Sequence, residues 1–493
     1  MNLIKRIRSS NGAATNSIML TFVQVVTTIL GMVVTKLLSV HFSLHEYGTY
    51  SQALLVANTV TSLSILGLTN ATNYFYNRTS LETEQRRYIA TIFSIQYVVG
   101  LTCGILIILL KAPICRYFSN PDLEKYLIIM AFTPLLGNVI TMYQTLFVSI
   151  GKAKVIAIRN LLVSIVRLLA VVIACFIVKD IITVLFVNVF MGVIQLFYFY
   201  LLFKKTKGPI RIKDSHVSLV KEILAFSIPM SVFVLTNSLS RDIDKYVISA
   251  FANTETLAVY TNAAKILPFD MLTASLITVL VPIITRMINQ KEYERAKDVF
   301  KLYLRIGYVL TFIFVGGAIA VSKDLMLFLY DEKYLVGLPV FLIYLVVDII
   351  RFANVTTILS GAGKTKILMI VSVTTMALNA ILNIWGYKLF GLVGPAIVTL
   401  LLTISMTIAL LHFGAKEIQT TIISLFNFRE IAIVAFQIVV MGTLTYGLST
   451  LLANYQLPSA INLIICYAIY ITVLGLLNYK RALECYRKLN QYK

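Results

Sequence analysis

Long apolar stretches recur along the whole of this 493-residue chain. Fourteen of them reach about 20 residues, the length that an α-helix needs to cross a bilayer. Backbone polar groups in lipid must be satisfied within their own segment, so each long apolar stretch predicts a helix. We therefore predict an all-α polytopic membrane protein with about 14 transmembrane helices. The predicted spans cover residues 14–41, 47–74, 88–110, 127–149, 156–178, 181–203, 222–250, 257–285, 302–321, 336–360, 367–387, 390–413, 431–453 and 458–478.

The basic residues between these stretches are distributed unevenly. With the first twelve residues in the cytoplasm, 28 of the 43 Lys and Arg residues fall in inside segments and only 7 in outside segments. The positive-inside rule then places both termini in the cytoplasm. The net charge of +21 is accounted for by this orientation and by contact with anionic membrane lipids, so no nucleic-acid partner is predicted.

Several short patterns recur about two hundred positions apart. The sequence Gly-Lys-x-Lys occurs at 151–154 and again at 363–366, and Lys36 corresponds to Lys245 at a similar offset. Such spacing indicates an internal repeat of six helices. Both copies begin on the inside, as in transporters built from parallel repeats. The expected organisation is a six-helix bundle over 1–210, a second over 211–420, and two further helices with a basic cytoplasmic tail over 421–493.

Enzymatic motifs are not apparent. Residues 360–365 resemble the end of a phosphate-binding P-loop, but Ile358 stands where that pattern requires glycine. The five cysteines lack the spacing of a metal site, and no acidic metal cluster or nucleophile motif is visible. The sequence predicts no enzyme, no catalytic residues, no metal site and no organic cofactor.

Charged residues inside the predicted spans are mostly basic. A charge at the bilayer centre costs at least about 2.5–3.5 kcal/mol, so such residues usually face a wet cavity or a partner. An excess of basic groups suits an anionic substrate. Arg159 and Arg305, near cytoplasmic ends, are expected to extend toward the membrane surface. The remaining candidates for a cationic substrate cavity are Lys36, Arg167, Arg241, Lys245, Lys265 and Arg351.

The predicted seventh span carries an unusual charged cluster. Arg241 and Lys245 are four residues apart and would share a helix face, while Asp244 is placed to pair with Arg241. The cluster therefore suits either a cavity lining or a self-neutralising set of ion pairs. Arg167 differs because no acid lies at helical spacing from it, which favours a cavity role.

Acidic residues in the spans are candidates for coupling transport to an H⁺ or Na⁺ gradient. Asp270 follows Pro268, and a carboxylate beside such a kink can bind Na⁺ or take up a proton. A structural hydrogen bond to a neighbouring helix is the alternative role. Asp348 is three residues from Arg351, which predicts a local pair. The full set of coupling candidates is Asp270, Asp348, Asp242 and Asp244.

Three stretches carry a family resemblance. They are Glu46-Tyr47-Gly48, the segment from Ile228-Pro229 through 241–246 to 260–266, and the segment from 363–366 to 390–396. With the span count and the repeat, they resemble the Wzx-type oligosaccharide flippases of the multidrug/oligosaccharidyl-lipid/polysaccharide (MOP) exporter superfamily. The resemblance extends over almost the whole chain.

This resemblance implies a V-shaped, MATE-like pair of six-helix bundles around a central cationic cavity. It also implies a cargo, undecaprenyl-pyrophosphate-linked glycan units, moved from the inner to the outer leaflet of the bacterial cytoplasmic membrane. Such units build O-antigen, capsule or exopolysaccharide, so other polysaccharide assembly proteins are candidate partners. Alternating access, reset by an H⁺ or Na⁺ gradient with Asp270 or Asp348 as coupling residue, is the expected mechanism.

Other functions remain open at this level. A cation-coupled multidrug exporter of the same superfamily would be expected to have an acid-dominated cavity, whereas basic groups dominate here. A flippase of lipid-linked peptidoglycan precursors fits the same charge pattern. A membrane-embedded polymerase or glycosyltransferase would need a large outside loop or a catalytic cluster, and a scaffold subunit would not need so many basic residues within its spans.

Overall fold

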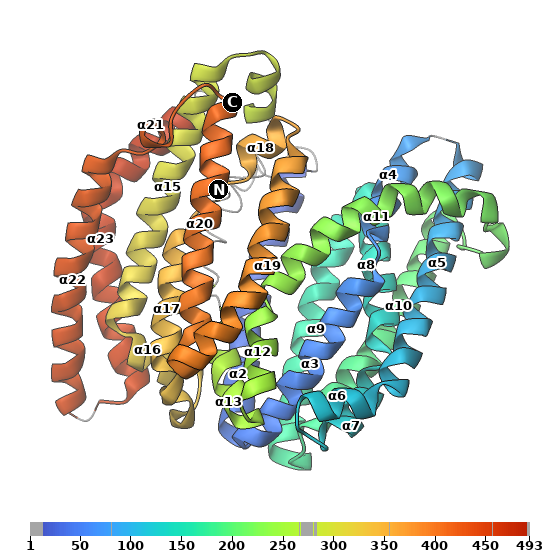
Figure 1. The fold of residues 1–493 in the computed structure, drawn as a ribbon, viewed down its shortest axis with the longest axis horizontal. Helices are drawn as coiled ribbons and strands as arrows, with labels where there is room; N and C mark the ends of the chain where they lie inside the picture. The colour runs from blue at the N-terminus through green and yellow to red at the C-terminus, as the bar shows by residue number, and fades with distance from the viewer. Residues whose placement is uncertain are drawn as a thin grey trace, which may run out of the picture. The chain divides into compact units, whose positions relative to one another are not determined.

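The computed structural model describes residues 13–79, 81–265, 267, 280, 283–353, 355–455 and 457–490. Throughout this part of the chain every regular element is a helix, which confirms the all-α prediction (Figure 1). Among the described residues, eleven segments are long and apolar enough to cross a membrane. The protein is therefore polytopic, as the hydropathy pattern predicts.

The candidate membrane segments account for twelve of the fourteen predicted spans. One candidate segment, Thr365–Glu417, contains two helices, α19 (Thr365–Phe390) and α20 (Gly394–Glu417), so the eleven segments correspond to twelve predicted spans. The predicted span 222–250 is divided into separate helices, and the span 257–285 falls largely on residues outside the described part. The count of fourteen stays a prediction.

The chain forms two compact units. The first contains residues 1–242 and 249–258, and the second contains 243–248 and 259–493. The helix α11 (Val217–Ser240) follows the predicted boundary near 210, yet it packs against helices of the first unit. The boundary between the two compact units therefore falls after α11. The predicted boundary of the sequence repeat, near residue 210, stays a prediction.

The first unit is built around an aromatic core. Fully or almost fully buried rings, among them Phe75, Phe93, Tyr143 and Phe199, pack where its central helices meet. Besides α11, its helices are α2 (Ala13–His41), α3 (Leu44–Ser64), α4 (Leu68–Arg78), α5 (Glu82–Leu109), α6 (Lys111–Tyr117), α7 (Leu123–Met130), α8 (Thr133–Ser149), α9 (Ala153–Ile173) and α10 (Ile182–Lys207), with a π-helix at Ala174–Val178 and a 3₁₀ turn at Ile212–Asp214.

The predicted second span is broken in the middle by a tight turn. Leu66 and Gly67 both have positive φ angles, 46° and 68°, and they separate α3 from α4. A β-carbon on Gly67 would lie 2.2 Å from the carbonyl oxygen of Ser227 in α11. Glycine at this position therefore permits both the left-handed turn and the close approach of the α11 backbone.

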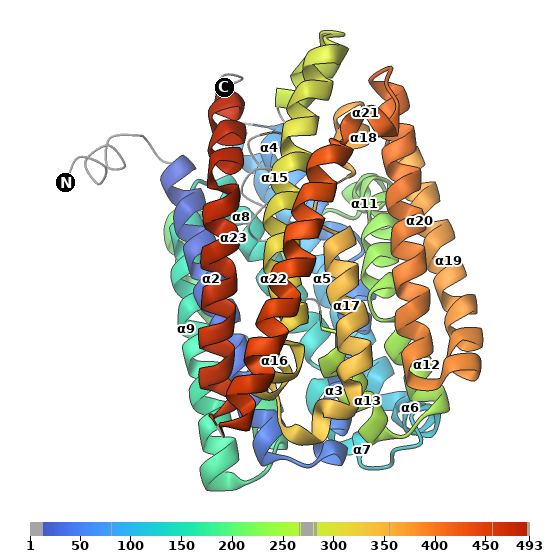
Figure 2. The same cartoon turned by 90° about the vertical axis from the view of Figure 1, so that its left-hand side faces the viewer.

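The second unit has its core around α15 (Tyr293–Ala320). Phe300, Tyr303, Tyr308 and Tyr470 are buried there, and α22 (Phe428–Asn454) and α23 (Ser459–Asn490) pack along α15 (Figure 2). Further helices of this unit are α16 (Ser322–Leu329), α17 (Leu338–Ile350), α18 (Thr357–Gly361), α19, α20 and α21 (Ile422–Leu425), with 3₁₀ turns at Glu332–Gly337 and Gly391–Val393. Helices α12 (Ile243–Phe251) and α13 (Thr254–Ala263) are divided between the two units.

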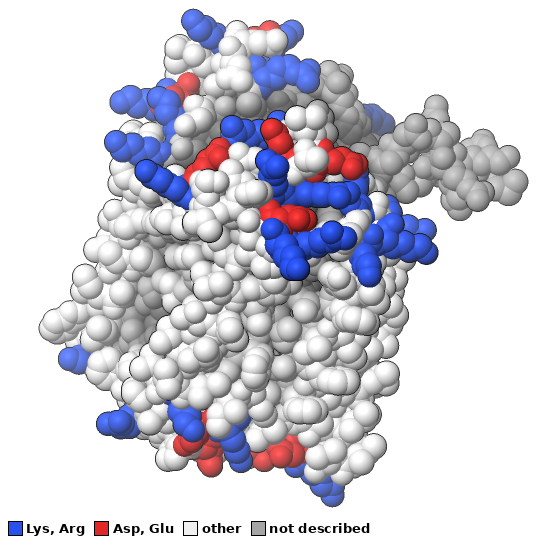
Figure 3. Space-filling view, turned by 90° about the vertical axis from the view of Figure 1, so that its right-hand side faces the viewer, with Lys and Arg blue, Asp and Glu red and all other residues white. Residues whose placement is uncertain are grey.

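Polar contacts between loops agree with the predicted alternation of crossings. Within each unit, loops and span ends predicted inside contact one another, and those predicted outside contact one another. On the side of the first unit drawn in Figure 3, Lys and Arg gather at one end, and an uncharged band separates them from a smaller charged group at the other end. The contacts are Arg78–Glu222, Lys152–Thr206 and Lys364–Glu417 on the predicted inside, and His45–Asp122 and Asp324–Asn462 on the predicted outside.

A buried ion-pair cluster joins α22 and α23 to α15. Arg305 Nε of α15 lies 2.6 Å from Glu430 Oε2 of α22, and its Nη2 lies 3.7 Å from Glu484 Oε2 of α23. The Tyr308 hydroxyl also donates to Glu430 at 3.1 Å, and Arg481 lies 3.8 Å from the same carboxylate. A buried carboxylate therefore holds Arg305 between three helices, and its extension toward the membrane surface stays a prediction.

The orientation is testable by thiol labelling. In a variant whose five cysteines are replaced by alanine, a cysteine in place of the exposed Lys125 should react with a membrane-impermeant maleimide added to intact cells. A cysteine in place of the exposed Lys213 should react only after permeabilisation. Equal labelling of both positions in intact cells would contradict the predicted topology.

The ion-pair cluster predicts a stability effect. Glu430→Ala should lower the free energy of unfolding by about 3 kcal/mol, because it leaves Arg305 buried without its main partner. Thermal melting of the detergent-purified protein measures the loss. Lys488→Ala, which removes an exposed ion pair with Glu484 on α23, is the control and should change the melting temperature little. Equal melting of the two variants would show that the cluster does not anchor α22.

Candidate functional site

Two of the predicted cavity cations lie on helices that pack together in the first unit. Lys36 is half-buried on α2, and Arg167 is exposed on α9, which packs along α2. The Sγ of Cys175, which follows α9, lies 3.8 Å from the carbonyl oxygen of Leu37. Lys36 is therefore level with the C-terminal end of the span that contains α9. Arg167 precedes Cys175 by eight residues, about 12 Å of helix. The two cations therefore lie at different depths.

Arg167 is a weakly compensated charge within a candidate span. It lies near the middle of the candidate span Lys154–Val178, and its Nη2 donates a hydrogen bond to the Tyr50 hydroxyl at 3.3 Å. No carboxylate in the described part of the chain forms an ion pair with it. A phenol oxygen cannot neutralise a guanidinium, so this side chain retains the capacity to bind an anion.

The predicted seventh span is interrupted where its charges lie. Helix α11 ends at Ser240 and α12 begins at Ile243, with Arg241 and Asp242 in the turn between them. The expectation that Arg241, Asp244 and Lys245 share one continuous helix is therefore wrong. Helical spacing cannot be used to pair residues across this break.

Asp244 lies in a buried cluster of neutral donors within the second unit. Its carboxylate is 3% exposed and accepts hydrogen bonds from the hydroxyls of Tyr260 at 2.9 Å and Tyr344 at 2.5 Å. The backbone N–H of Lys245 also donates to it at 2.8 Å. Two phenols and an amide stabilise a carboxylate by charge-assisted hydrogen bonds. This arrangement joins α12, α13 and α17 through a single acidic group.

Asp348 lies one helical turn beyond Tyr344 on α17 and is also buried. Its carboxylate accepts a hydrogen bond from the backbone N–H of Leu267 at 3.2 Å. At the start of α17, Gly337 packs closely against α13, where an added β-carbon would lie 2.9 Å from Val259 and Ala263. The structure thus brings Asp244 and Asp348 to one face of α17.

The other predicted site residues are located as follows. Lys265 is exposed just after α13, and Arg351 is exposed at the C-terminal end of α17, one turn after Asp348. Asp270 lies outside the described residues. The roles of Lys265, Arg351 and Asp270 in binding or coupling stay predictions.

The recognisable motif Glu46-Tyr47-Gly48 has a structural role. Glu46 and Ser43 form a capping box at the start of α3, with the Ser43 N–H donating to Glu46 Oε2 at 2.8 Å. A β-carbon on Gly48 would lie 2.3 Å from the carbonyl oxygen of Thr254, so only glycine permits α13 to approach. The motif therefore fixes how α3 begins and how it meets α13.

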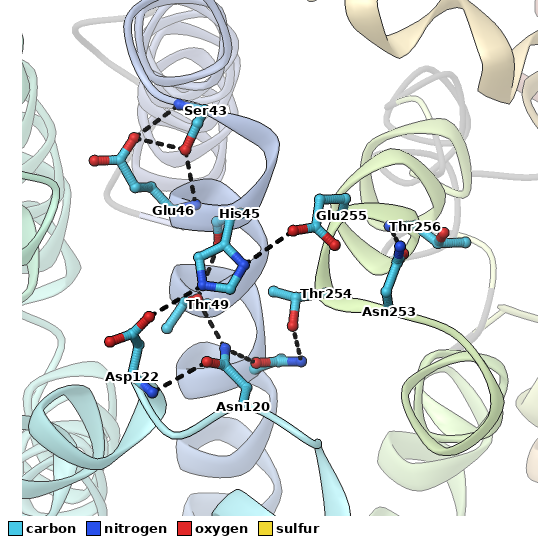
Figure 4. Close-up of polar contacts among 11 residues, drawn as sticks. Ser43, His45, Glu46, Thr49, Asn120, Asp122, Asn253, Thr254, Glu255 and Thr256 are labelled. Carbon is cyan, nitrogen blue, oxygen red and sulfur yellow. Dashed lines mark hydrogen bonds and ion pairs between the residues drawn. The ribbon is translucent and has the colours of Figure 1, made fainter.

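Sequence analysis missed a polar network at the same place (Figure 4). His45 Nδ1 lies 3.0 Å from Glu255 Oε1, and its Nε2 lies 3.2 Å from Asp122 Oδ2. Next to it, Asn120 donates to Thr49 at 2.8 Å and to the Gln52 amide oxygen at 2.7 Å. Both imidazole nitrogens donate when the ring is protonated, so one histidine can bridge α7 and α13. The Ser43-x-x-Glu46 spacing signals a helix start beside His45. The partners of His45, Asp122 and Glu255, are too distant in sequence to be predicted from a local pattern.

Two protein families match the chain. The family described as "Polysaccharide biosynthesis protein" matches residues 13–288, and the MatE family matches residues 229–385. No curated protein sequence matches the chain.

Solved structures of transporters are similar in fold. The lipid II flippase MurJ in an inward closed conformation is 16% identical with a TM-score of 0.72, over 93% of this chain and 99% of that protein. An inward-facing multidrug resistance MATE family transporter of the MOP superfamily is 13% identical with a TM-score of 0.66, over 80% and 94%. A MOP superfamily transporter from Pyrococcus furiosus is 14% identical with a TM-score of 0.57, over 82% and 94%. The chain has the fold of these transporters, and because the first family match covers more than half of its length, it belongs to the polysaccharide biosynthesis protein family.

Proposed function

We propose that this protein is a Wzx-type flippase that moves undecaprenyl-pyrophosphate-linked oligosaccharide units across the bacterial cytoplasmic membrane for surface polysaccharide synthesis. Family membership supports the polysaccharide context, and the shared fold with flippases and exporters supports transport. The observation that carries the proposal is Arg167, an exposed guanidinium within a candidate span that forms no ion pair among the described residues.

The chemistry of the cargo fits this residue. A lipid pyrophosphate concentrates negative charge in a small group, and a guanidinium binds phosphate oxygens through paired hydrogen bonds. Arg241, in the turn between α11 and α12, offers a second exposed guanidinium. Lys36, Lys245, Lys265 and Arg351 complete the proposed cationic set. The glycan would cross through an aqueous path while the polyprenyl tail stays in lipid.

A flippase of lipid-linked peptidoglycan precursors is the second candidate. The fold likeness to MurJ favours it, and a lipid pyrophosphate would engage the same cations. The two candidates differ in the glycan, so the mass of the lipid that accumulates in the absence of the protein distinguishes them. A multidrug exporter of cationic compounds is disfavoured because basic residues outnumber acids within the spans.

We further propose that Asp244 couples transport to an H⁺ or Na⁺ gradient, with Asp348 as its neighbour on α17. A proton or Na⁺ on Asp244 would compete with the hydroxyl groups of Tyr260 and Tyr344 for the carboxylate oxygens. Because those bonds join three helices, their rearrangement gives a local way for an ion to bias packing. Asp242 and Asp270 remain the less supported alternatives.

Charge reversal tests the cationic set. Arg167→Glu and Arg241→Glu should each lower export of lipid-linked glycan by about 100-fold at normal abundance, since each replaces an anion-binding group with a repelling one. Surface polymer and extracted lipid-linked oligosaccharide in the native host provide the measurement. Arg116→Glu, an exposed position on the short helix α6, is the matched control and should export normally. Normal export by both test variants would refute the cationic binding model.

Substitution of Asp244 tests the coupling. Asp244→Asn keeps the size of the side chain and should abolish the acceleration of flipping by an imposed ion gradient in reconstituted vesicles. Asp324→Asn is the control, because Asp324 accepts hydrogen bonds from Ser449 and Asn462 in the same unit but is not a proposed coupling residue. Retained gradient dependence in Asp244→Asn would remove Asp244 from the mechanism.

A further inference from the structure

His45 contacts two acidic groups at once on the predicted outer side of the first unit (Figure 4). It is the second residue of α3, and its side chain is 44% exposed. The carboxylates that face its two ring nitrogens, those of Asp122 and Glu255, are 62% and 40% exposed. Water and protons therefore reach all three groups. None of the three belongs to the proposed cargo-binding or coupling residues.

The two contacts need one more proton than a neutral imidazole supplies. A neutral ring has a single N–H, so one nitrogen donates and the other presents a lone pair. Here Nδ1 lies 3.0 Å from Glu255 Oε1, and Nε2 lies 3.2 Å from Asp122 Oδ2. With a neutral ring, one of these contacts sets a nitrogen lone pair against an ionised carboxylate. With a protonated ring, both become charge-assisted hydrogen bonds.

The charges that act directly on this ring are both negative, those of Asp122 and Glu255. Within the described part of the chain, neither carboxylate forms an ion pair with a lysine or arginine. The other charged or titratable groups of the surrounding elements have contacts of their own: Glu46 with Ser43, Lys111 with Glu124, and Lys125 and Asp180 with Tyr126. Among the described residues, the protonated ring is therefore the cation that neutralises this acidic pair.

The protonated ring holds the beginning of α13 in place. Residues 249–258 belong to the first unit by their contacts, whereas 243–248 and the chain from 259 onward belong to the second. Gly48 allows the Thr254 carbonyl oxygen to approach α3, where an added β-carbon would lie 2.3 Å from it. The Gln52 amide also donates to the Thr254 hydroxyl at 3.3 Å. His45 adds a charged contact to these neutral ones, so its protonation changes how firmly α13 is attached.

We propose that His45 is a proton-sensing residue of the predicted outer side, where one bound proton fastens the start of α13 to α3 and α7. With the proton bound, the imidazolium bridges Glu255 and Asp122. Without it, one hydrogen bond is lost and a lone pair faces a carboxylate. The bridge is therefore present at low pH and lost as the pH rises through the range in which histidine titrates, about pH 5–8. The contacts involve neither the cargo nor Asp244, so the proposal is independent of the proposed function.

Distances between spin labels test this attachment. In the full-length protein with its five cysteines replaced by alanine, labelled cysteines would replace Lys125, exposed on α7, and Thr256, in the first turn of α13. Pulsed electron paramagnetic resonance would measure their separation at about pH 5.5 and pH 8.5. The share of molecules in the wider distance component should rise about threefold at the higher pH, as expected for the loss of one exposed charged contact.

Substitutions of His45 separate its charge from its packing. His45→Gln cannot become charged and should give the larger share of the wide component at both pH values. His45→Arg has a permanent charge with donors for both carboxylates, and it should give the smaller share at both. Glu124→Gln, which removes an exposed carboxylate of α7 paired with Lys111, is the matched control and should keep the pH response. Thermal melting shows whether each variant is folded.

Two results would overturn the proposal in these experiments. One is a distance distribution of the unaltered protein that does not change with pH. The other is a pH response that persists in His45→Gln, because another group would then be responsible. Nitrogen-15 NMR gives a second measurement, since the chain has only four histidines and the His45 signal is identified by its loss in His45→Gln. At about pH 6 both ring nitrogens should be protonated, and a neutral ring at that pH would refute the proposal.

Discussion

Charge within a low-dielectric span must be compensated, and the structure compensates its buried charges in different ways. Glu430 is compensated by Arg305, Arg481 and a phenol, and it joins α15 to α22. Among the described residues, Asp244 is compensated by neutral donors, two tyrosine hydroxyls and an amide. Breaking a buried pair is costly because one charge is left without a partner. Residues of the first kind therefore act mainly in stability.

Arg167 is compensated only weakly, and this is why it is the proposed position for binding an anionic cargo. Its guanidinium donates a hydrogen bond to the Tyr50 hydroxyl and forms no ion pair among the described residues, so its capacity to bind an anion is retained. Asp244 is intermediate, because neutral donors stabilise its charge without cancelling it. Such a carboxylate can exchange its hydrogen bonds for a proton or a cation, as coupling requires. The proposed division of roles between Arg167 and Asp244 thus follows from the same physical cost.

Most of the helical architecture could be predicted from the sequence because its signal is local. Long apolar stretches impose helices, and the alternation of basic loops agrees with the loop contacts within each unit. The interruptions could not be predicted. Hydropathy does not report the left-handed turn at Leu66 and Gly67, which depends on the approach of Ser227 from α11. It likewise does not report the break at Arg241 and Asp242, nor the packing of α11 with the first unit.

For the candidate site, the sequence could predict which charged residues lie within spans but not which residues they contact. The excess of basic residues and the isolation of Arg167 were visible from sequence, whereas the pairing of Asp244 with Arg241 assumed a helix that is broken. The partners of Asp244 are 16 and 100 residues away, and Glu255, which contacts His45, is 210 residues away. Such contacts are set by tertiary packing. Glu46 and Gly48, which carried the family resemblance, serve helix capping and close approach.

The most direct test of the central claim is translocation in vesicles that contain only the purified protein. Undecaprenyl-pyrophosphate-linked oligosaccharide would be placed in both leaflets, and access of an added glycosidase or lectin would report its movement. The account predicts rapid loss of the protected inner-leaflet pool with the unaltered protein, and protection with Arg167→Glu. Protection that persists with the unaltered protein under an imposed H⁺ or Na⁺ gradient, or equal translocation by both proteins, would contradict it.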